Sequence, residues 1–96
     1  MTDKVYVSAL LTTVPGKEDL MREALKELVA AVRSEPGCTL YDLHESASTP
    51  GNFMFYEIWD SEQDLEVHNN TELMKAFGDK AGGWLGSITV ETYRRL

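Results

Sequence analysis

The 96-residue sequence contains one cysteine, Cys38, and no long apolar run. A single cysteine cannot form an internal disulfide, which agrees with a reducing compartment. Cys38 follows Pro36-Gly37 with no base beside it in the sequence, so we interpret it as a packing residue. No stretch approaches the ~20 apolar residues of a membrane-spanning helix, and the N-terminus lacks the features of a signal peptide. These absences predict a cytoplasmic protein without a membrane partner.

Basic residues are scarce, because 9 Lys and Arg stand against 16 Asp and Glu, for a formal net charge of −7. Nucleic acids and anionic membranes require a basic surface, so neither is an expected partner. The two histidines, His44 and His68, do not have metal-ligand spacing, and with one cysteine they predict no metal site. Glycine-rich nucleotide loops and nucleophile elbows are also missing, which argues against nucleotide cofactors and serine-hydrolase chemistry.

The most informative stretch begins with Phe53–Trp59, which has the composition of a strand. Strand side chains alternate between faces, so the two faces carry Phe53, Phe55, Glu57 and Trp59 on one side and Met54, Tyr56 and Ile58 on the other. Both faces are apolar, which predicts a strand covered on both sides. A buried Glu57 requires a partner, and we interpret it as a hydrogen bond or salt bridge at a dimer interface, with a catalytic acid as the alternative.

A short helix is predicted to follow this strand. Asp60 is the candidate N-cap, and Gln63 three residues later completes a capping-box pattern. Leu65 and His68 are three residues apart, so they share one helix face. If Leu65 faces the sheet, His68 does too, and the histidine points at the apolar face of the sheet. His44, near a loop, is interpreted as a surface residue.

The remaining elements complete a β-α-β-β-α-β order. The pattern predicts strands at Val5–Val14, Cys38–Glu45 and Ser87–Tyr93, a helix over Lys17–Glu35, and a second helical piece over Glu72–Ala81 capped by Thr71. This order is typical of a ferredoxin-like α+β fold with an antiparallel four-stranded sheet and helices on one face, and residues 1–96 form a single domain. Because the strands are apolar on both faces, we expect a homodimer packed sheet on sheet.

With these residues in place, the chain resembles the antibiotic biosynthesis monooxygenase (ABM) domain family, and within it the small quinol-monooxygenase-type proteins. The resemblance is carried by Pro15-Gly16, Glu35-Pro36-Gly37-Cys38 with Tyr41, then Phe53, Glu57 and Trp59, Leu65-Glu66-Val67-His68, and Met74-Lys75-Ala76-Phe77. It implies a dimeric α+β barrel with a pocket for a planar aromatic or quinone-like molecule. It also implies oxygenation without metal or flavin, with the substrate anion giving an electron to dioxygen.

Two departures from the family pattern bear on chemistry. Many members have a second histidine, and the matching position here is Leu73. The haem-degrading branch uses an asparagine, a tryptophan and a later histidine, and the matching positions here are Ser8, His68 and Gly78. The resemblance therefore does not imply haem degradation, and it does not support a two-histidine metal site.

The candidate catalytic residue is His68, as a general base for a phenol or hydroquinone, since histidine titrates near neutral pH. The alternative is a histidine hydrogen-bonded within the packing. The candidate substrate-binding residues are aromatic side chains that can stack on a flat ligand, namely Phe55, Tyr56, Trp59 and Trp84; core and dimer packing is their alternative. The favoured function is a cofactor-independent monooxygenase acting on a quinol. A non-catalytic dimeric ligand-binding module, and an enzyme that isomerises or degrades a small carbonyl metabolite, stay open.

Overall fold

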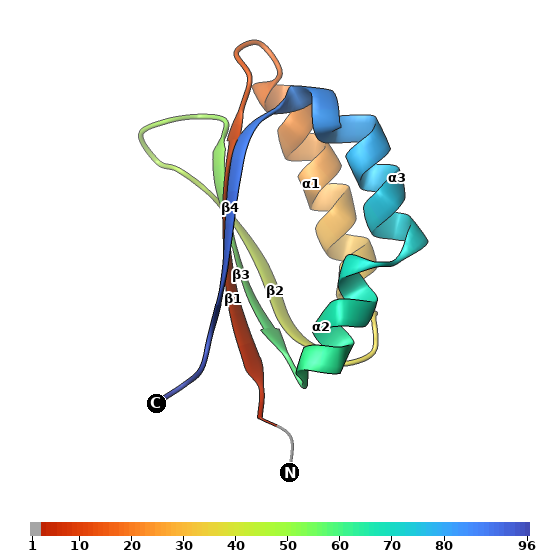
Figure 1. Cartoon of the computed structure of the whole chain (residues 1–96). Coiled ribbons are helices and arrows are strands. Elements are labelled where there is room, and N and C mark those ends of the chain that lie inside the picture. The colour runs from red at the N-terminus through yellow and green to blue at the C-terminus, as the bar shows by residue number, and fades with distance from the viewer. Residues whose placement is uncertain (1–2) are drawn as a thin grey trace.

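The strands and helices follow one another in the predicted order. The computed structural model describes residues 3–96. Its elements are β1 (Val5–Thr13), α1 (Glu18–Val32), β2 (Cys38–Glu45), β3 (Asn52–Trp59), α2 (Glu62–Asn69), α3 (Glu72–Ala81), a 3₁₀ turn (Gly82–Trp84) and β4 (Leu85–Tyr93). The sheet and the helices form two layers (Figure 1). The predicted ferredoxin-like α+β fold is confirmed.

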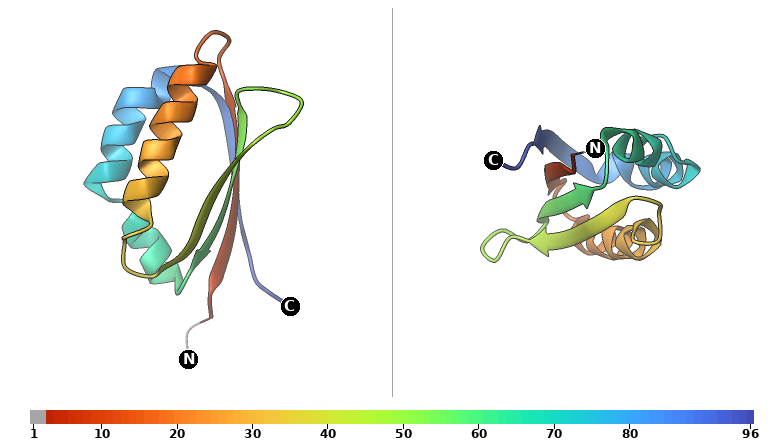
Figure 2. Two further views of the ribbon diagram at one scale, coloured as in Figure 1. Left: turned by 180° about the vertical axis from the view of Figure 1, so that it is seen from behind. Right: turned by 90° about the horizontal axis from the view of Figure 1, so that it is seen from below.

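The four strands form one antiparallel sheet in the order β2-β3-β1-β4. The central pair aligns Val7 with Glu57 and Ala9 with Phe55, and all four side chains are buried on the face that the helices cover. Figure 2 shows from two further directions that the helices lie on this face alone. The other face, which we call the open face, is not covered by any element within residues 3–96.

The end of α1 differs from the prediction and matters for the site. The helix was expected to reach Glu35 but ends at Val32. Glu35 N–H donates to the Val32 carbonyl at 2.9 Å, and Gly37 has a φ of 79°, a conformation that glycine adopts readily. The chain therefore turns after Val32, which places Glu35 in the connection between α1 and β2.

The start of α2 also differs. The predicted cap at Asp60 is wrong, because Ser61 is the N-cap and its Oγ accepts a hydrogen bond from Asp64 N–H at 3.1 Å. The Asp60 side chain instead accepts from Lys4 Nζ at 2.8 Å. The cap predicted for α3 is confirmed, since Thr71 Oγ1 accepts from the backbone N–H of Met74 at 3.2 Å.

No helix in the described part of the chain is long and apolar enough to cross a membrane.

The open face exposes large apolar side chains, as the two-sided pattern predicts. Leu10 is 54% exposed, and Tyr56 and Tyr93 are also exposed. On the helix side, β4 is less covered than the other strands, because Ile88 and Val90 remain exposed although they point toward the helical layer. The space between β4 and the helices is therefore open to solvent.

Candidate active site

His68 is the centre of the candidate site. It projects from α2 on the same side as Leu65, as predicted, and is only 2% exposed. Its Nδ1 lies 2.9 Å from Oε1 of Glu35. The imidazole is stacked on Trp59, with ring centroids 4.5 Å apart, and meets the ring of Tyr41 edge-on at 5.6 Å. Contacts on several sides thus fix the orientation of the ring.

Glu35 determines which His68 nitrogen is available. A carboxylate oxygen accepts hydrogen bonds, so we assign the proton of the pair to Nδ1 of His68. In the neutral ring Nε2 is then an acceptor. Oε2 of Glu35 is buried with no hydrogen-bond partner within residues 3–96. The imidazole of His68 is therefore the one partner of this carboxylate among the described side chains. The arrangement can take a proton at Nε2 and stabilise the imidazolium that results.

Glu57 and Trp59 form a second buried polar pair beside His68. Trp59 Nε1–H donates to Oε1 of Glu57 at 2.9 Å. Burial raises the pKa of the Glu57 carboxyl, and the Trp59 hydrogen bond and the His68 charge oppose this effect only in part. Glu57 faces the helices rather than the open face, so its interpretation as a dimer-interface residue is wrong. The alternation of strand faces decides this, because Glu57 shares its face with the buried Phe55 and Trp59.

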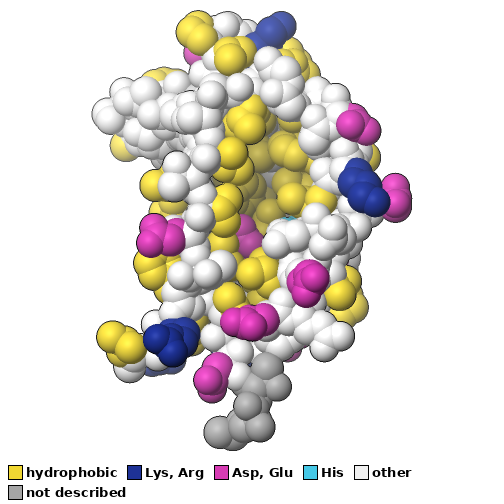
Figure 3. Space-filling view, in the orientation of Figure 1, with side chains coloured by type: hydrophobic (Ala, Val, Ile, Leu, Met, Phe, Trp, Pro, Cys, Tyr) yellow, Lys and Arg dark blue, Asp and Glu magenta, His cyan; other side chains and the backbone are white. Residues whose placement is uncertain are grey.

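A cavity of about 170 Å³ lies between the sheet and the three helices, and it reaches both His68 and Glu57. Figure 3 shows a hollow with hydrophobic walls between the two layers. No Lys or Arg is among the lining residues, which are Val7, Ala9, Leu11, Leu25, Leu28, Tyr41, Phe55, Glu57, Leu65, His68, Asn69, Met74, Phe77, Ile88, Val90 and Thr92. The cavity thus combines apolar walls with a few polar groups, a pattern typical of small-molecule sites.

The structure brings together some of the predicted site residues and separates others. His68 and Phe55 line the cavity. Trp59 is fully buried and lies against His68, outside the cavity lining. Trp84 is half-buried after α3 and packs against the core. Tyr56 lies on the open face, beside Tyr6 and Tyr93, so it does not share a space with His68.

Residues that sequence reasoning did not assign to the site are Glu35 and Tyr41. Tyr41 lines the cavity and packs on Phe55 with ring centroids 5.0 Å apart. Burial raises the pKa of its phenol, so Tyr41 stays neutral. Both belong to segments quoted for the family resemblance, but no local pattern in the sequence marks either as a contact of His68.

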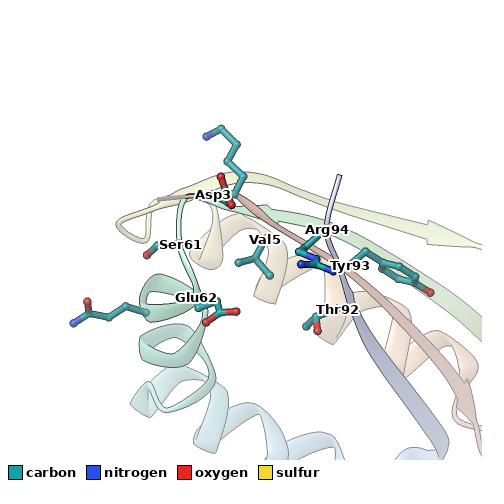
Figure 4. Close-up of a pocket in the computed structure, with 9 residues that line it drawn as sticks. Asp3, Val5, Ser61, Glu62, Thr92, Tyr93 and Arg94 are labelled. Carbon is teal, nitrogen blue, oxygen red and sulfur yellow. The ribbon is translucent and has the colours of Figure 1, made fainter. Parts of the chain in front are cut away.

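A larger hollow of about 700 Å³ lies at the end of the molecule near the chain termini (Figure 4). Its walls carry charges of both signs, including Lys4, Glu62 and Arg94. These side chains are exposed, and the hollow contains no buried titratable group. Thr92 lines both this hollow and the apolar cavity, so the two spaces adjoin.

Within residues 3–96 there is no group of three or more His, Cys, Asp or Glu side chains that could hold a metal ion. Nδ1 of His68 and Oε1 of Glu35 are bonded to each other, and Oε1 of Glu57 accepts from Trp59, so these atoms already have partners.

Comparison with known proteins identifies the family. Residues 4–80 match the model of the antibiotic biosynthesis monooxygenase family, so the chain belongs to that family. The crystal structure of PA3566 from Pseudomonas aeruginosa superimposes with a TM-score of 0.93 at 31% identity, covering 100% of this chain and 97% of that one. The structure of Rv0793 from Mycobacterium tuberculosis has a TM-score of 0.89 at 26% identity, covering 98% and 96%.

The matches to the curated relatives cover a smaller share of each protein than the structural matches do. Rv0793, which carries the provisional name of a monooxygenase, is 32% identical over 71 residues, or 74% of this chain and 69% of its own length. The protein sll1783 of Synechocystis is 27% identical over 79 residues, which is 82% of this chain. The match spans only 54% of the Synechocystis protein and 62% of a Pestalotiopsis microspora relative.

Proposed function

We propose that this protein is a monooxygenase that oxidises a quinol, or a related small electron-rich aromatic, with dioxygen. The observation that carries the proposal is the Glu35–His68 pair at the wall of an apolar cavity. Membership in the ABM family and relatives named as monooxygenases support the reaction class.

The role of the protein in this reaction is proton transfer and positioning. A neutral quinol is a poor electron donor, whereas its anion reduces dioxygen far more readily. His68 takes the hydroxyl proton at Nε2, and Glu35 stabilises the imidazolium. For a hydroquinone the balanced reaction is hydroquinone plus O₂ to hydroxyquinone plus water. The substrate supplies all four electrons, and one oxygen atom enters the ring while the other leaves as water.

The stoichiometry of the reaction is compatible with catalysis without a bound flavin. The balanced reaction needs no reductant besides the substrate, so we propose that neither flavin nor metal takes part.

We also propose that the protein acts as a homodimer in the cytoplasm. The support is the open face, where apolar side chains such as Leu10, Tyr56 and Tyr93 are exposed on one continuous sheet. Monomeric proteins rarely expose large contiguous apolar patches. A second copy of the chain, packed sheet on sheet about a twofold axis, covers this surface.

The test is oxygen uptake by the purified protein with a panel of hydroquinones, compared with His68→Ala. We expect uptake by the wild type, and a rate at least about tenfold lower in the variant, because general-base help usually contributes about 10²–10⁴-fold. Raising the pH should restore part of the lost rate by ionising the quinol in solution. His44→Ala, which removes the exposed histidine of β2, is the matched control and should retain the wild-type rate. Because His44 lies on the open face, beside Leu10, the sedimentation of this variant is measured alongside the rate.

Two results separate the alternatives. A His68→Ala variant with wild-type activity and a lower melting temperature assigns His68 to packing and removes it from the mechanism. Failure of the wild type to consume oxygen with any quinol, combined with binding of the same compounds under anaerobic conditions, favours the ligand-binding module over the enzyme.

A further inference from the structure

Glu57 is a buried carboxyl group that the proton-transfer step described above does not use. It is 6% exposed and lines the same cavity as His68. Its one hydrogen bond within residues 3–96 is the bond that Oε1 accepts from Trp59. Oε2 has no such partner, and Glu57 forms no salt bridge among the described residues. Unlike Oε2 of Glu35, this oxygen is not among the fully buried unpaired atoms, so it is accessible from the cavity, where a ligand can reach it.

The groups around Glu57 provide no free positive charge. Tyr41 is its register partner on β2, and Cys38 lies on the same strand as Tyr41. Burial raises the pKa of both the tyrosine phenol and the Cys38 thiol, so neither supplies a charge. Val7, its partner on β1, does not titrate. His68 from α2 is the one group here that can become cationic, and it is already bonded to Glu35.

These surroundings favour a neutral Glu57. Ionised, it would be a second negative charge close to the Glu35–His68 pair, in a space without Lys or Arg. Burial acts in the same direction, since it raises the pKa of this carboxyl. In the neutral form, Oε1 can still accept from Trp59 while the second oxygen carries a proton that it can donate.

We propose that Glu57 is a ligand-contacting residue that works as a neutral acid and donates a hydrogen bond from Oε2 to an oxygen of the bound molecule. His68 and Glu57 then have opposite roles, since Nε2 of His68 accepts from a hydroxyl group and Glu57 donates to a second oxygen. The pair selects an uncharged planar ring that carries at least two oxygen functions, one donating and one accepting. Identifying that ligand as a quinol rests on the proposed function, whereas the donor role of Glu57 does not.

The donor role can be tested by binding alone, without turnover. Acetophenone has a carbonyl acceptor and no ionisable proton, and ethylbenzene has nearly the same shape without the carbonyl. Both would be titrated under nitrogen between pH 5 and pH 8 into wild type, Glu57→Gln and Glu57→Ala. The two tryptophan indole N–H signals would be followed by NMR. Trp59 reports on Glu57 directly, since its N–H donates to that carboxyl, and Trp84 serves as the internal reference.

For the wild type we expect acetophenone to bind more tightly than ethylbenzene at pH 5, and any change with rising pH to be a loss of this preference, because ionised Glu57 cannot donate. Glu57→Gln should keep the preference at every pH, because the amide donates without titrating. Glu57→Ala should lose about tenfold in acetophenone affinity while binding ethylbenzene as before, in keeping with one hydrogen bond in a buried site. Glu66→Gln makes the same substitution at an exposed residue of α2, away from the cavity lining and the open face, and should behave like wild type.

Three results would overturn the proposal. One is a Glu57→Gln variant that loses the preference as fully as Glu57→Ala, which identifies an ionised acceptor. Another is a wild-type preference for acetophenone that is absent at pH 5 and appears as the pH rises. The third is the absence of acetophenone binding to the wild type at pH 5.

If Glu57→Ala does not fold, the pH dependence of the Trp59 signal in the wild type, compared with Glu57→Gln, still decides the protonation state. Absence of oxygen uptake with intact binding would contradict the monooxygenase proposal alone.

Discussion

Oε1 of Glu35 lies 2.9 Å from Nδ1 of His68, although 33 residues separate them in the sequence. The pair predicts that Glu35→Gln lowers the rate of quinol oxidation several-fold, less than the loss of about tenfold or more expected for His68→Ala. A glutamine amide can still contact the ring, but it does not stabilise an imidazolium. The measurement is kcat and KM across pH, with the protonated nitrogen of His68 identified by ¹⁵N NMR.

Glu66→Gln is the control for that substitution, because Glu66 is an exposed residue of the same helix as His68. It should leave both the rate and the His68 signals unchanged. A Glu35→Gln variant with the wild-type rate and wild-type tautomer would show that the carboxylate has no positioning role.

The loop that carries Glu35 is tightly fitted against α2, and Gly37 is the point of contact. Its φ is 79°, and a Cβ built at this position falls on the side chain of Asp64. Gly37→Ala should therefore destabilise the fold by about 1–3 kcal/mol and move the start of α2 away from the loop. Because α2 also carries His68, we expect catalytic activity to fall together with the melting temperature.

Gly78→Ala provides the comparison, since nothing lies within 4 Å of a Cβ at that position in α3. Alanine favours a helix over glycine by about 0.5–1 kcal/mol, so this variant should be as stable as the wild type or more stable. Thermal unfolding and rate measurements on both variants test whether Gly37→Ala loses stability and activity while Gly78→Ala keeps both. Equal melting temperatures for Gly37→Ala and wild type would show that the loop adapts without affecting α2.

The fold was predictable because its signals are local. The alternation in Phe53–Trp59 placed Phe55, Glu57 and Trp59 on one face, and the spacing of Leu65 and His68 placed the histidine toward the sheet. The cap at Ser61 was missed because Asp60 and Ser61 are both good caps, and the pairing of Asp60 with Lys4 is a long-range contact that the pattern does not contain.

The site was only partly predictable because its contacts join distant segments. Glu35 was assigned to the end of α1, and only the turn after Val32 brings it to His68. Trp59 was expected to stack on a ligand, and it stacks on the histidine instead. Aromatic residues in a strand indicate a core, but the sequence does not show which of them border an unfilled space.

The open face predicts that a charge at its centre prevents association. Leu10 on β1 is 54% exposed and is paired with Met54 of β3 and Thr89 of β4. Leu10→Lys should shift the protein from dimer to monomer at micromolar concentration and increase the binding of a hydrophobic dye, because a buried lysine without a partner is strongly disfavoured.

Sedimentation velocity on matched variants tests this expectation. Leu20→Lys introduces the same charge at an exposed leucine of α1 and should leave the assembly unchanged. A wild type that sediments as a monomer at micromolar concentration would remove the dimer from the proposal.

The raised pKa of Glu57 predicts an unusual dependence of stability on pH. Between the pKa of a glutamate in the unfolded chain, about 4.3, and the higher pKa of Glu57 in the fold, the folded state binds more protons than the unfolded state. Over this window the free energy of unfolding therefore decreases as pH rises, by up to about 1.4 kcal/mol per pH unit for one proton. Glu57→Gln removes this term and keeps an acceptor for Trp59.

Other carboxyl groups titrate in the opposite sense, so the comparison has to be made between variants. The hydrogen bond from Arg22 lowers the pKa of Glu45 to about 2, and Lys4 lowers that of Asp60. Their stabilisation is present above the unfolded pKa and is lost as pH falls, in wild type and Glu57→Gln alike. Denaturant unfolding from pH 4 to pH 8, at one protein concentration, should show the variant gaining stability over the wild type as pH rises. Parallel curves for the two proteins would mean that Glu57 titrates as it does in the unfolded chain, and the neutral-acid role would fail with it.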